Sequence, residues 1–279
     1  MIPYRATLDV PRELARHLAR LLRAERHRRH TPKGSRALTC FHQAVFALRW
    51  FRNGGDITAL GRDHGISRAT AYRYLQEAVD VLADQAPGLH QALDRARADH
   101  LPHLILDGKL IPSDRCAEQT ISIKGKDIDL WYSGKAHAHG GNVQALFAPD
   151  GFPLWISHVA PGSVHDLTAA RRDVLGALYR LATRDGIPTL ADGAYEGAGH
   201  GVHTPIPQPE DGRDLSPDNR TYNRLLRNLR CLGERGFALL TQRWRTLQHI
   251  TASPSRIGDI AKAALALTHF EHGYLTGIR

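Results

Sequence analysis

The chain has 279 residues, 42% hydrophobic and 23% charged, which is ordinary for a globular protein with one large core or two smaller ones. No stretch approaches the roughly 18 apolar residues of a membrane span, we see no secretion signal in the first residues, and three widely spaced cysteines argue against a disulfide framework or a cysteine zinc site. Lys and Arg outnumber Asp and Glu by 37 to 28, and residues 1–100 hold 17 of the basic and 10 of the acidic residues. These features predict a reducing cytosol and a polyanionic partner such as DNA or RNA.

Helical patterns fill the first hundred residues. Apolar residues recur at helical spacing over residues 8–30, and residues 37–50 are typical of a largely buried helix. Two shorter helical stretches follow up to Ala86, and a polar helix leads to Pro102. We therefore expect an all-α domain over residues 1–100.

Residues 56–80 have the layout of a helix-turn-helix. Ile57 can face inward on the first helix, Gly65 permits a tight turn, and Ser67 can cap the second helix. The alternative is a plain helical hairpin with its arginines in solvent. We favour a DNA-reading module, with side chains of the second helix directed toward a groove or the phosphates.

The pattern changes to strands and helices after residue 100. Apolar strands are expected at 103–107, 142–147 and 152–157, with a hairpin turn between the last two. A helix over 166–184, a strand over 188–192, a loop over 193–217 and a long helix from Ser216 follow. This order predicts an α/β domain over residues 101–279.

Three acids stand out by their settings. Asp107 closes an apolar strand and is followed by a glycine, and Asp192 is placed in the same way. Glu234 is the only acid between Asn219 and Ile257, in a stretch with eight arginines. Phosphodiester cleavage with two divalent cations needs such a trio from separate elements, because Mg²⁺ prefers oxygen ligands. For each acid alone, a cap or a salt bridge such as Glu234 with Arg230 is the competing interpretation.

The chain resembles the DDE transposases of bacterial insertion sequences, in the group whose eukaryotic relatives are the Harbinger elements. The resemblance rests on ordered blocks that include Leu106-Asp-Gly-Lys-Leu-Ile-Pro112, Pro161-Gly-Ser-Val-His-Asp166, Leu190-Ala-Asp-Gly-Ala-Tyr195 and Arg230-Cys-Leu-Gly-Glu-Arg235. It implies an RNase H-like catalytic domain behind the helix-turn-helix, with Asp107, Asp192 and Glu234 as catalytic residues and ligands of two Mg²⁺ or Mn²⁺ ions. Asp166 is the rival second carboxylate, although its position at a helix start favours a capping role.

The resemblance also implies double-stranded DNA as partner, at the element ends and at the target. The residues we expect to contact DNA are Ser67, Arg68, Thr70, Tyr72, Arg73, Lys135, Arg227, Arg230, Arg243 and Arg245. The family often has a Tyr where Arg227 stands and a Lys where Thr241 stands, so Arg243 or Arg245 is expected to take over from that lysine.

The expected function is therefore binding of terminal inverted repeats followed by metal-dependent strand cleavage and strand transfer. We expect a homodimer or larger oligomer on DNA, located in the bacterial cytoplasm at the nucleoid. The alternative is a non-catalytic DNA-binding protein, either a decayed transposase or a repressor of its own element. A nuclease that cuts without joining fits the same residues.

Overall fold

The computed structural model describes residues 8–122, 125–211 and 213–274, and the chain divides into two compact units. Unit 1 runs up to Ala86 and also contains Thr241–His249 and the residues from Asp259 onward, whereas unit 2 contains Pro87–Leu240 and Ile250–Gly258. This division differs from a boundary near residue 100. The first seven residues, where we expect no secretion signal, lie outside the described part. None of the described helices has the length and apolar character needed to cross a membrane.

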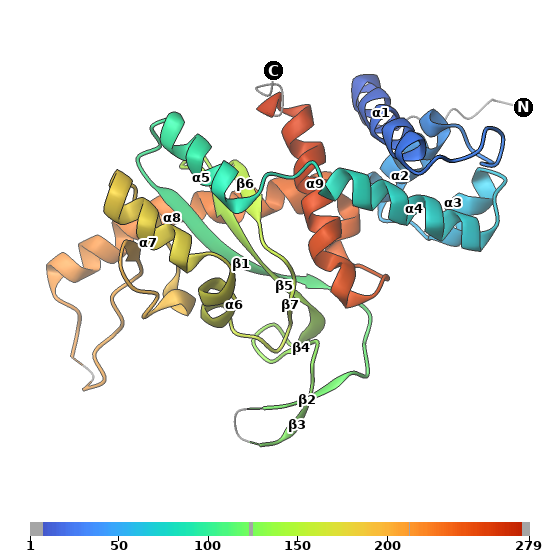
Figure 1. Cartoon of the computed structure of the whole chain (residues 1–279). Coiled ribbons are helices and arrows are strands. Elements are labelled where there is room, and N and C mark those ends of the chain that lie inside the picture. Colours follow the sequence, from blue (N-terminus) through green and yellow to red (C-terminus); the bar gives the residue numbers. More distant parts are fainter. Residues whose placement is uncertain (1–7, 123–124, 212, 275–279) are drawn as a thin grey trace, which may run out of the picture. The chain divides into compact units, whose positions relative to one another are not determined.

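Unit 1 is helical. Its elements are α1 (Arg12–Arg28), α2 (Cys40–Asn53), α3 (Ile57–Asp63), α4 (Arg68–Ala83), the 3-10 turn η2 (Arg245–Gln248) and α9 (Ile257–Glu271) from Asp259 on (Figure 1). The predicted cap forms at Ser67, which accepts the backbone N–H of Thr70 at the start of α4. Asp56 caps α3 in the same way, by accepting the N–H groups of Thr58 and Ala59. Gly65, in the turn between these helices, has a φ of 65°, which favours glycine.

The core of unit 1 includes the C-terminal segments, which the sequence patterns do not anticipate. Trp244 is fully buried, and its ring contacts that of Phe51 on α2 with centroids 6.4 Å apart. Its indole N–H donates to the Thr268 hydroxyl on α9 at 2.9 Å. The Arg243 guanidinium donates to the Glu271 carboxylate at 2.6 and 2.9 Å and to Asp9 at 3.0 Å. These contacts hold α9 in the helical unit.

Unit 2 is built on a mixed sheet. Its strands are β1 (Leu104–Pro112), β4 (Tyr132–Ser133), β5 (Ala138–Phe147), β6 (Pro153–Ile156), β7 (Ala160–Pro161), β8 (Thr189–Leu190) and β9 (Val202–His203). The order is β4-β5-β1-β8-β9, with β6 and β7 also paired to β5. A separate hairpin joins β2 (Gln119–Ile121) to β3 (Asp127–Asp129).

The strand directions agree with the predicted RNase H-like fold. β1, β5 and β6 are antiparallel neighbours, and the expected hairpin turn lies between β5 and β6. β8 then pairs parallel to β1, and β9 pairs parallel to β8. Three antiparallel strands followed by parallel strands on the other side of β1 form an α/β domain of the expected class.

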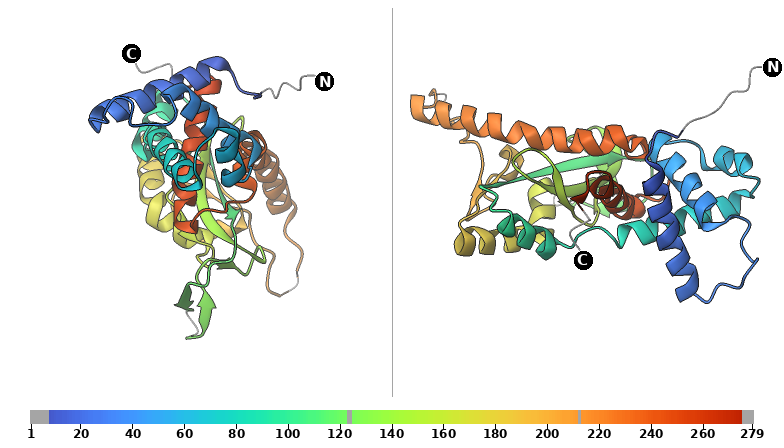
Figure 2. Two further views of the ribbon diagram at one scale, coloured as in Figure 1. Left: turned by 90° about the vertical axis from the view of Figure 1, so that its right-hand side faces the viewer. Right: turned by 90° about the horizontal axis from the view of Figure 1, so that it is seen from above.

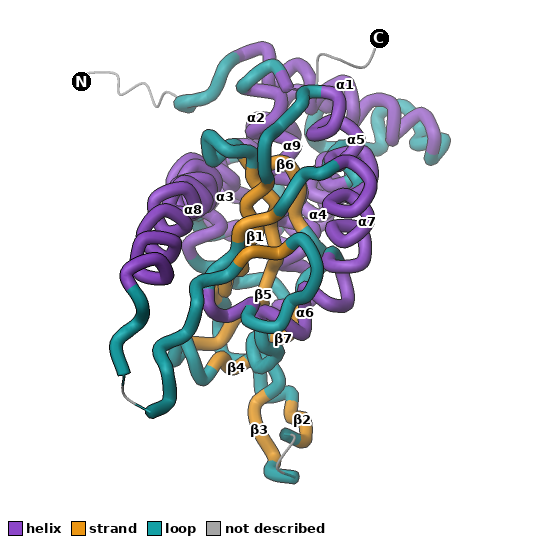
Figure 3. The backbone as a smooth tube through the Cα atoms, turned by 90° about the vertical axis from the view of Figure 1, so that its left-hand side faces the viewer, coloured by secondary structure: helices purple, strands orange, loops and turns teal. Residues whose placement is uncertain are grey.

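Helices cover both faces of this sheet. The remaining elements of unit 2 are α5 (Leu89–Ala98), α6 (Asp166–Asp173), α7 (Leu175–Asp185), η1 (Gly193–Tyr195), α8 (Pro217–Arg243) up to Leu240, and η3 (Pro254–Arg256). Helix α8 lies along one face, and α5, α6 and α7 lie on the other (Figures 2 and 3).

Glycines allow α8 to approach the sheet closely. A Cβ added to Gly233 would lie 2.7 Å from Ile105 Cγ2, and one added to Gly236 would overlap Phe147 and the Gly151 carbonyl. The ring of Phe237 packs edge-on against Phe147, with centroids 5.0 Å apart. Helix α8 is therefore fixed in depth and rotation against β1 and β5.

Three expected element bounds need correction. Asp107 does not close its strand, because β1 continues to Pro112 through backbone pairing with β5. The helix expected over 166–184 is broken at Val174, which separates α6 from α7. The expected loop after Asp192 contains η1 and the strand β9, whose two residues pair with β8.

Candidate active site

Asp107 lies on β1, and Asp192 follows the end of β8, the strand that pairs parallel to β1. Leu104 pairs with Thr189 and Ile105 pairs with Leu190, so the same register continued by two residues brings Asp192 beside Asp107. The charge of Asp192 acts on Asp107, which agrees with this placement. The side chain of Asp192 also begins η1, where it accepts the backbone N–H of Ala194 at 2.9 Å.

Asp107 points to the face of the sheet that α8 covers. Side chains two apart on a strand share a face, and Ile105 lies against Gly233 of α8. Arg230, one turn before Gly233, places its guanidinium 3.9 Å from the Asp107 carboxylate. The same guanidinium lies 3.5 Å from Glu234. The predicted trio and Arg230 therefore belong to one neighbourhood.

The electrostatics of this neighbourhood disfavour the ionised form of Asp107. Its side chain is only 14% exposed, and burial raises its pKa to about 6 from the ordinary 3.8. Arg230 lowers the pKa, while the carboxylates of Asp192 and Glu234 raise it further. A cation placed among these groups would offset the repulsion.

The donor chemistry fits a hard divalent cation, since the groups facing Asp107 include two further carboxylates. Within the described ranges, however, no three Asp, Glu, His or Cys side chains stand close enough together to hold a metal ion. The side chain of Glu234 is 67% exposed and lies against Arg230. Joint coordination of metal ions by all three acids stays a prediction.

Asp166 lies on the opposite side of β1. Gly108 follows Asp107 and so faces away from α8, and a Cβ at Gly108 would come within 2.7 Å of Asp166 Oδ1, 2.8 Å of Gln144 Nε2 and 2.9 Å of the Tyr195 hydroxyl. Position 108 therefore needs a glycine, because a side chain there would overlap the polar groups on this face. The charges of Asp107 and Asp192 nevertheless reach this face, since both act on Lys135 and on Tyr195.

These polar groups form a buried hydrogen-bond chain. The Tyr195 hydroxyl donates to Gln144 Oε1 at 2.5 Å, Gln144 Nε2 donates to Asn142 Oδ1 at 2.9 Å, and Asn142 Nδ2 donates to Asp166 Oδ1 at 2.8 Å. Burial and then the charges of nearby aspartates raise the pKa of Tyr195 well above 10, so the phenol remains a donor. Lys135 ends the chain, with Nζ donating to Asp166 Oδ2 at 3.0 Å.

The hydrogen-bonded cap expected from Asp166 does not form, although the carboxylate lies in the first turn of α6 as expected. Asp166 is the first residue of α6, but no side chain caps this helix. Both carboxylate oxygens are instead used by Asn142 and Lys135. Asp166 therefore holds Lys135 at a hollow of about 450 Å³ that Gly108 and Ser163 also line. Burial lowers the pKa of Lys135, but hydrogen bonding to Asp166 and nearby carboxylates raise it overall, so the ammonium stays charged.

The predicted DNA-contacting residues of the second helix lie at the start of α4. Ser67, Arg68, Tyr72 and Arg73 are exposed, and Thr70 is half-buried. Arg68 lies over the Tyr72 ring, 5.7 Å from its centroid, and Arg73 donates to the Thr70 hydroxyl at 3.2 Å.

The predicted arginines near the C-terminus have different settings. Arg227 on α8 and Arg245 on η2 are exposed. Arg243 is paired with Glu271 and Asp9, so in this structure it braces unit 1. The sequence patterns also gave no role to Asn142, Gln144 and Tyr195, although alternation along β5 places Asn142 and Gln144 on one face.

The comparisons with known proteins come from a family profile and a solved structure. The profile of a family described as DDE superfamily endonuclease matches residues 106–269. A crystal structure of a pre-cleavage Mos1 transpososome is similar at 11% identity over 92% of this chain and 98% of that chain, with a TM-score of 0.20, too low to carry an argument. No curated protein matches the sequence.

Proposed function

Because the chain belongs to the DDE superfamily endonuclease family, we propose that it is an insertion-sequence transposase. In this proposal α3 and α4 bind the terminal inverted repeats, and Asp107, Asp192 and Glu234 serve strand cleavage and strand transfer. The observation that carries it is the position of Asp107 beside Asp192, on the face of the sheet that Arg230 of α8 also reaches. The enzyme acts on DNA as a homodimer or larger oligomer.

The carboxylates are proposed to hold two Mg²⁺ or Mn²⁺ ions. Such ions stabilise the attacking and leaving oxygens of an in-line displacement at phosphorus. The chain's own part is to present hard oxygen ligands from β1, from the segment that follows β8, and from α8. Burial is the largest cause of the raised pKa of Asp107, and the charges of Asp192 and Glu234 raise it further. This repulsion among the carboxylates supports the proposal, because bound cations would offset it.

Arg230 has a second part in the proposal. It is 16% exposed and contacts both Asp107 and Glu234. A DNA phosphate is a stronger bidentate partner for a guanidinium than a carboxylate 3.5 Å away. Phosphate binding by Arg230 would release Glu234 to turn toward Asp107. Lys135, held by Asp166, supplies positive charge for the DNA backbone on the other side of β1.

A non-catalytic DNA-binding protein is the second candidate. The exposed position of Glu234 against Arg230 favours it, and so do Arg227 and Thr241 at positions where the family often has other residues. Such a protein would keep the basic helices of unit 1 and bind the same DNA. It would leave no metal-dependent product.

Cleavage of end-labelled DNA separates the two candidates. The substrate is a duplex carrying the inverted repeats that flank the gene, incubated with and without Mg²⁺ at matched DNA occupancy. We expect wild type to nick it only with Mg²⁺, and Asp107→Asn and Glu234→Gln to bind without nicking. Cleavage that survives both substitutions would contradict the carboxylate mechanism, and an inactive wild type that binds DNA would favour the non-catalytic candidate.

A further inference from the structure

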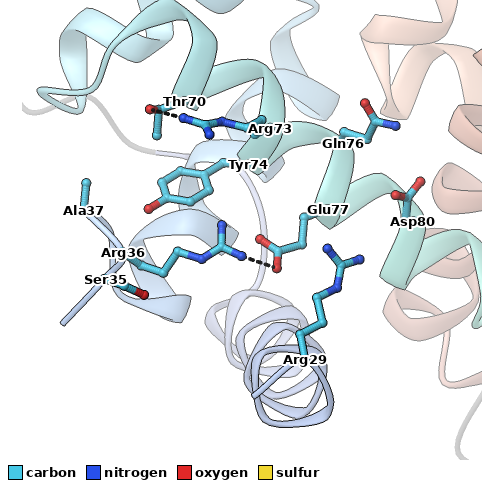
Figure 4. A pocket seen from close by; sticks show the side chains of 10 residues that line it. All are labelled: Arg29, Ser35, Arg36, Ala37, Thr70, Arg73, Tyr74, Gln76, Glu77 and Asp80. Atoms are coloured by element: carbon cyan, nitrogen blue, oxygen red, sulfur yellow. Dashed lines mark hydrogen bonds and ion pairs between the residues drawn. The ribbon is translucent and has the colours of Figure 1, made fainter. Parts of the chain in front are cut away.

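Unit 1 contains a hollow of about 610 Å³ beside the start of α4. It lies between the last residues of α1 and Arg29, the loop before α2, and one side of α4 (Figure 4). The side chains of Arg29, Arg36, Arg73 and Thr70 line it. Three guanidinium groups from three chain segments thus face one space, which we name the arginine hollow.

Acidic side chains also lie in and beside the wall of the arginine hollow. Glu77 is 4% exposed, and its two oxygens accept from Arg36 Nη2 at 3.2 Å and from Gln43 Nε2 at 2.9 Å. The carboxylate charge of Glu77 is therefore paired with Arg36 inside the hollow. Arg29 pairs with Glu25, which Arg28 also contacts, and Arg73 donates to the neutral Thr70 hydroxyl at 3.2 Å. Asp80 is the other acid that lines the space.

The walls are held by a buried network. Gln43, which is fully buried, accepts from Arg26 Nη2 at 2.6 Å and donates to the Tyr74 carbonyl at 3.0 Å. Arg26 also donates to the Leu38 carbonyl, and the Leu38 N–H donates to the Tyr74 hydroxyl at 3.3 Å. The loop before α2 is thereby tied to α4. Arg36 is steadied further over the Tyr74 ring, 5.6 Å from its centroid.

Preorganised guanidinium groups are suited to phosphate oxygens, because their N–H donors match the spacing of those oxygens. Thr70 and Arg73 connect the arginine hollow to the exposed start of α4, where Arg68 and Tyr72 also lie. A DNA strand along this part of α4 would carry a phosphodiester past the opening.

We infer that the arginine hollow binds one backbone phosphate of duplex DNA and so fixes the register of α4 on the duplex. The inference rests on the proposed function and adds Arg29 and Arg36 to the residues that serve DNA binding. Such a contact positions the protein and carries no base specificity.

Salt-dependent binding of the full chain tests this inference. The probe is a fluorescently labelled mixed-sequence duplex of about 30 base pairs, titrated at several KCl concentrations by anisotropy. One phosphate contact contributes about 0.9 to the slope of log K against log salt. Arg29→Gln with Arg73→Gln should lower the slope by about that amount and weaken binding about eightfold at 0.1 M salt. Arg16→Gln with Arg20→Gln, on exposed positions of α1 outside the hollow, is the matched control and should keep the wild-type slope.

The affinities and salt slopes of wild type and the two double variants separate the possible outcomes. An equal loss in both double variants would overturn the inference, because it would reflect net charge alone. Calorimetry with inorganic phosphate distinguishes a second ligand. If the Arg29 and Arg73 variant keeps the wild-type salt slope for DNA but no longer binds inorganic phosphate, the hollow binds free phosphate and the DNA assignment is overturned. If wild type does not bind the duplex at all, the proposed function fails. If wild type binds the duplex and the Arg29 and Arg73 variant binds it with the same affinity and salt slope, the inference fails while the proposed function stands.

Discussion

Replacing Asp107 by asparagine is expected to raise the free energy of unfolding of unit 2 at neutral pH in the presence of a chelator. The folded carboxyl has a pKa of about 6, against 3.8 for an ordinary aspartate. Each pKa unit corresponds to about 1.36 kcal/mol, so the ionised group costs the folded state about 3 kcal/mol at pH 7. Asparagine has a similar shape and carries no charge, so this cost disappears.

The pH dependence has a definite sign. The folded state binds the proton more tightly than the unfolded state, so stability is highest below pH 3.8, falls between pH 3.8 and 6, and is constant above pH 6. The gain from Asp107→Asn should therefore shrink from about 3 kcal/mol at pH 7 to well below 1 kcal/mol at pH 4. Urea unfolding across this range measures it, with the exposed Asp214→Asn as control. A loss of stability of similar size at every pH would refute the reasoning.

Mg²⁺ gives the same variant a second readout. If Asp107 is a ligand, the free energy of unfolding of wild type should rise with the logarithm of the Mg²⁺ concentration once that concentration exceeds Kd. The substituted protein should gain much less, because one charged ligand is gone. Equal stabilisation of both proteins by Mg²⁺ would remove Asp107 from the ligand set.

Other substitutions test the packing around the site, and urea unfolding measures each of them. Gly236→Ala should cost about 1–3 kcal/mol, because its Cβ would overlap the sheet, whereas Gly176→Ala, with open space on α7, should gain about 0.5–1 kcal/mol; equal effects would contradict the close packing of α8. Tyr195→Phe should cost about 1–3 kcal/mol, because it leaves the buried Gln144 oxygen without its donor. An unchanged free energy of unfolding would contradict the contribution of this hydrogen bond to stability. Arg243→Gln should destabilise unit 1 by about 1–3 kcal/mol through the loss of its carboxylate partners, which an unchanged midpoint would contradict.

The sequence predicts the helices of unit 1 well because their signals are local. Caps such as Asp56 and Ser67, and a turn glycine at Gly65, act within three or four residues. The apolar run that predicts β5 and the turn at Gly151 are equally local. These features need no knowledge of distant contacts.

The features that the sequence analysis missed depend on long-range contacts. The close approach of α8 depends on Gly233 and Gly236 meeting residues of β1 and β5, and a glycine within a helix gives no sign of its neighbour. The extension of β1 beyond Asp107 comes from pairing with β5. The hydrogen bonds of Asp166 come from Asn142 and Lys135, more than twenty residues away in sequence, so its position at a helix start predicted a cap instead.

The central claim is that Asp192, and not Asp166, completes the site with Asp107. The measurement that tests it most directly is Mg²⁺-dependent cleavage of end-labelled DNA by Asp192→Asn beside Asp166→Asn, at equal DNA occupancy. We predict no cleavage by Asp192→Asn and slower but detectable cleavage by Asp166→Asn, which loses only the charge that holds Lys135. Cleavage that persists in Asp192→Asn and vanishes in Asp166→Asn would contradict the account.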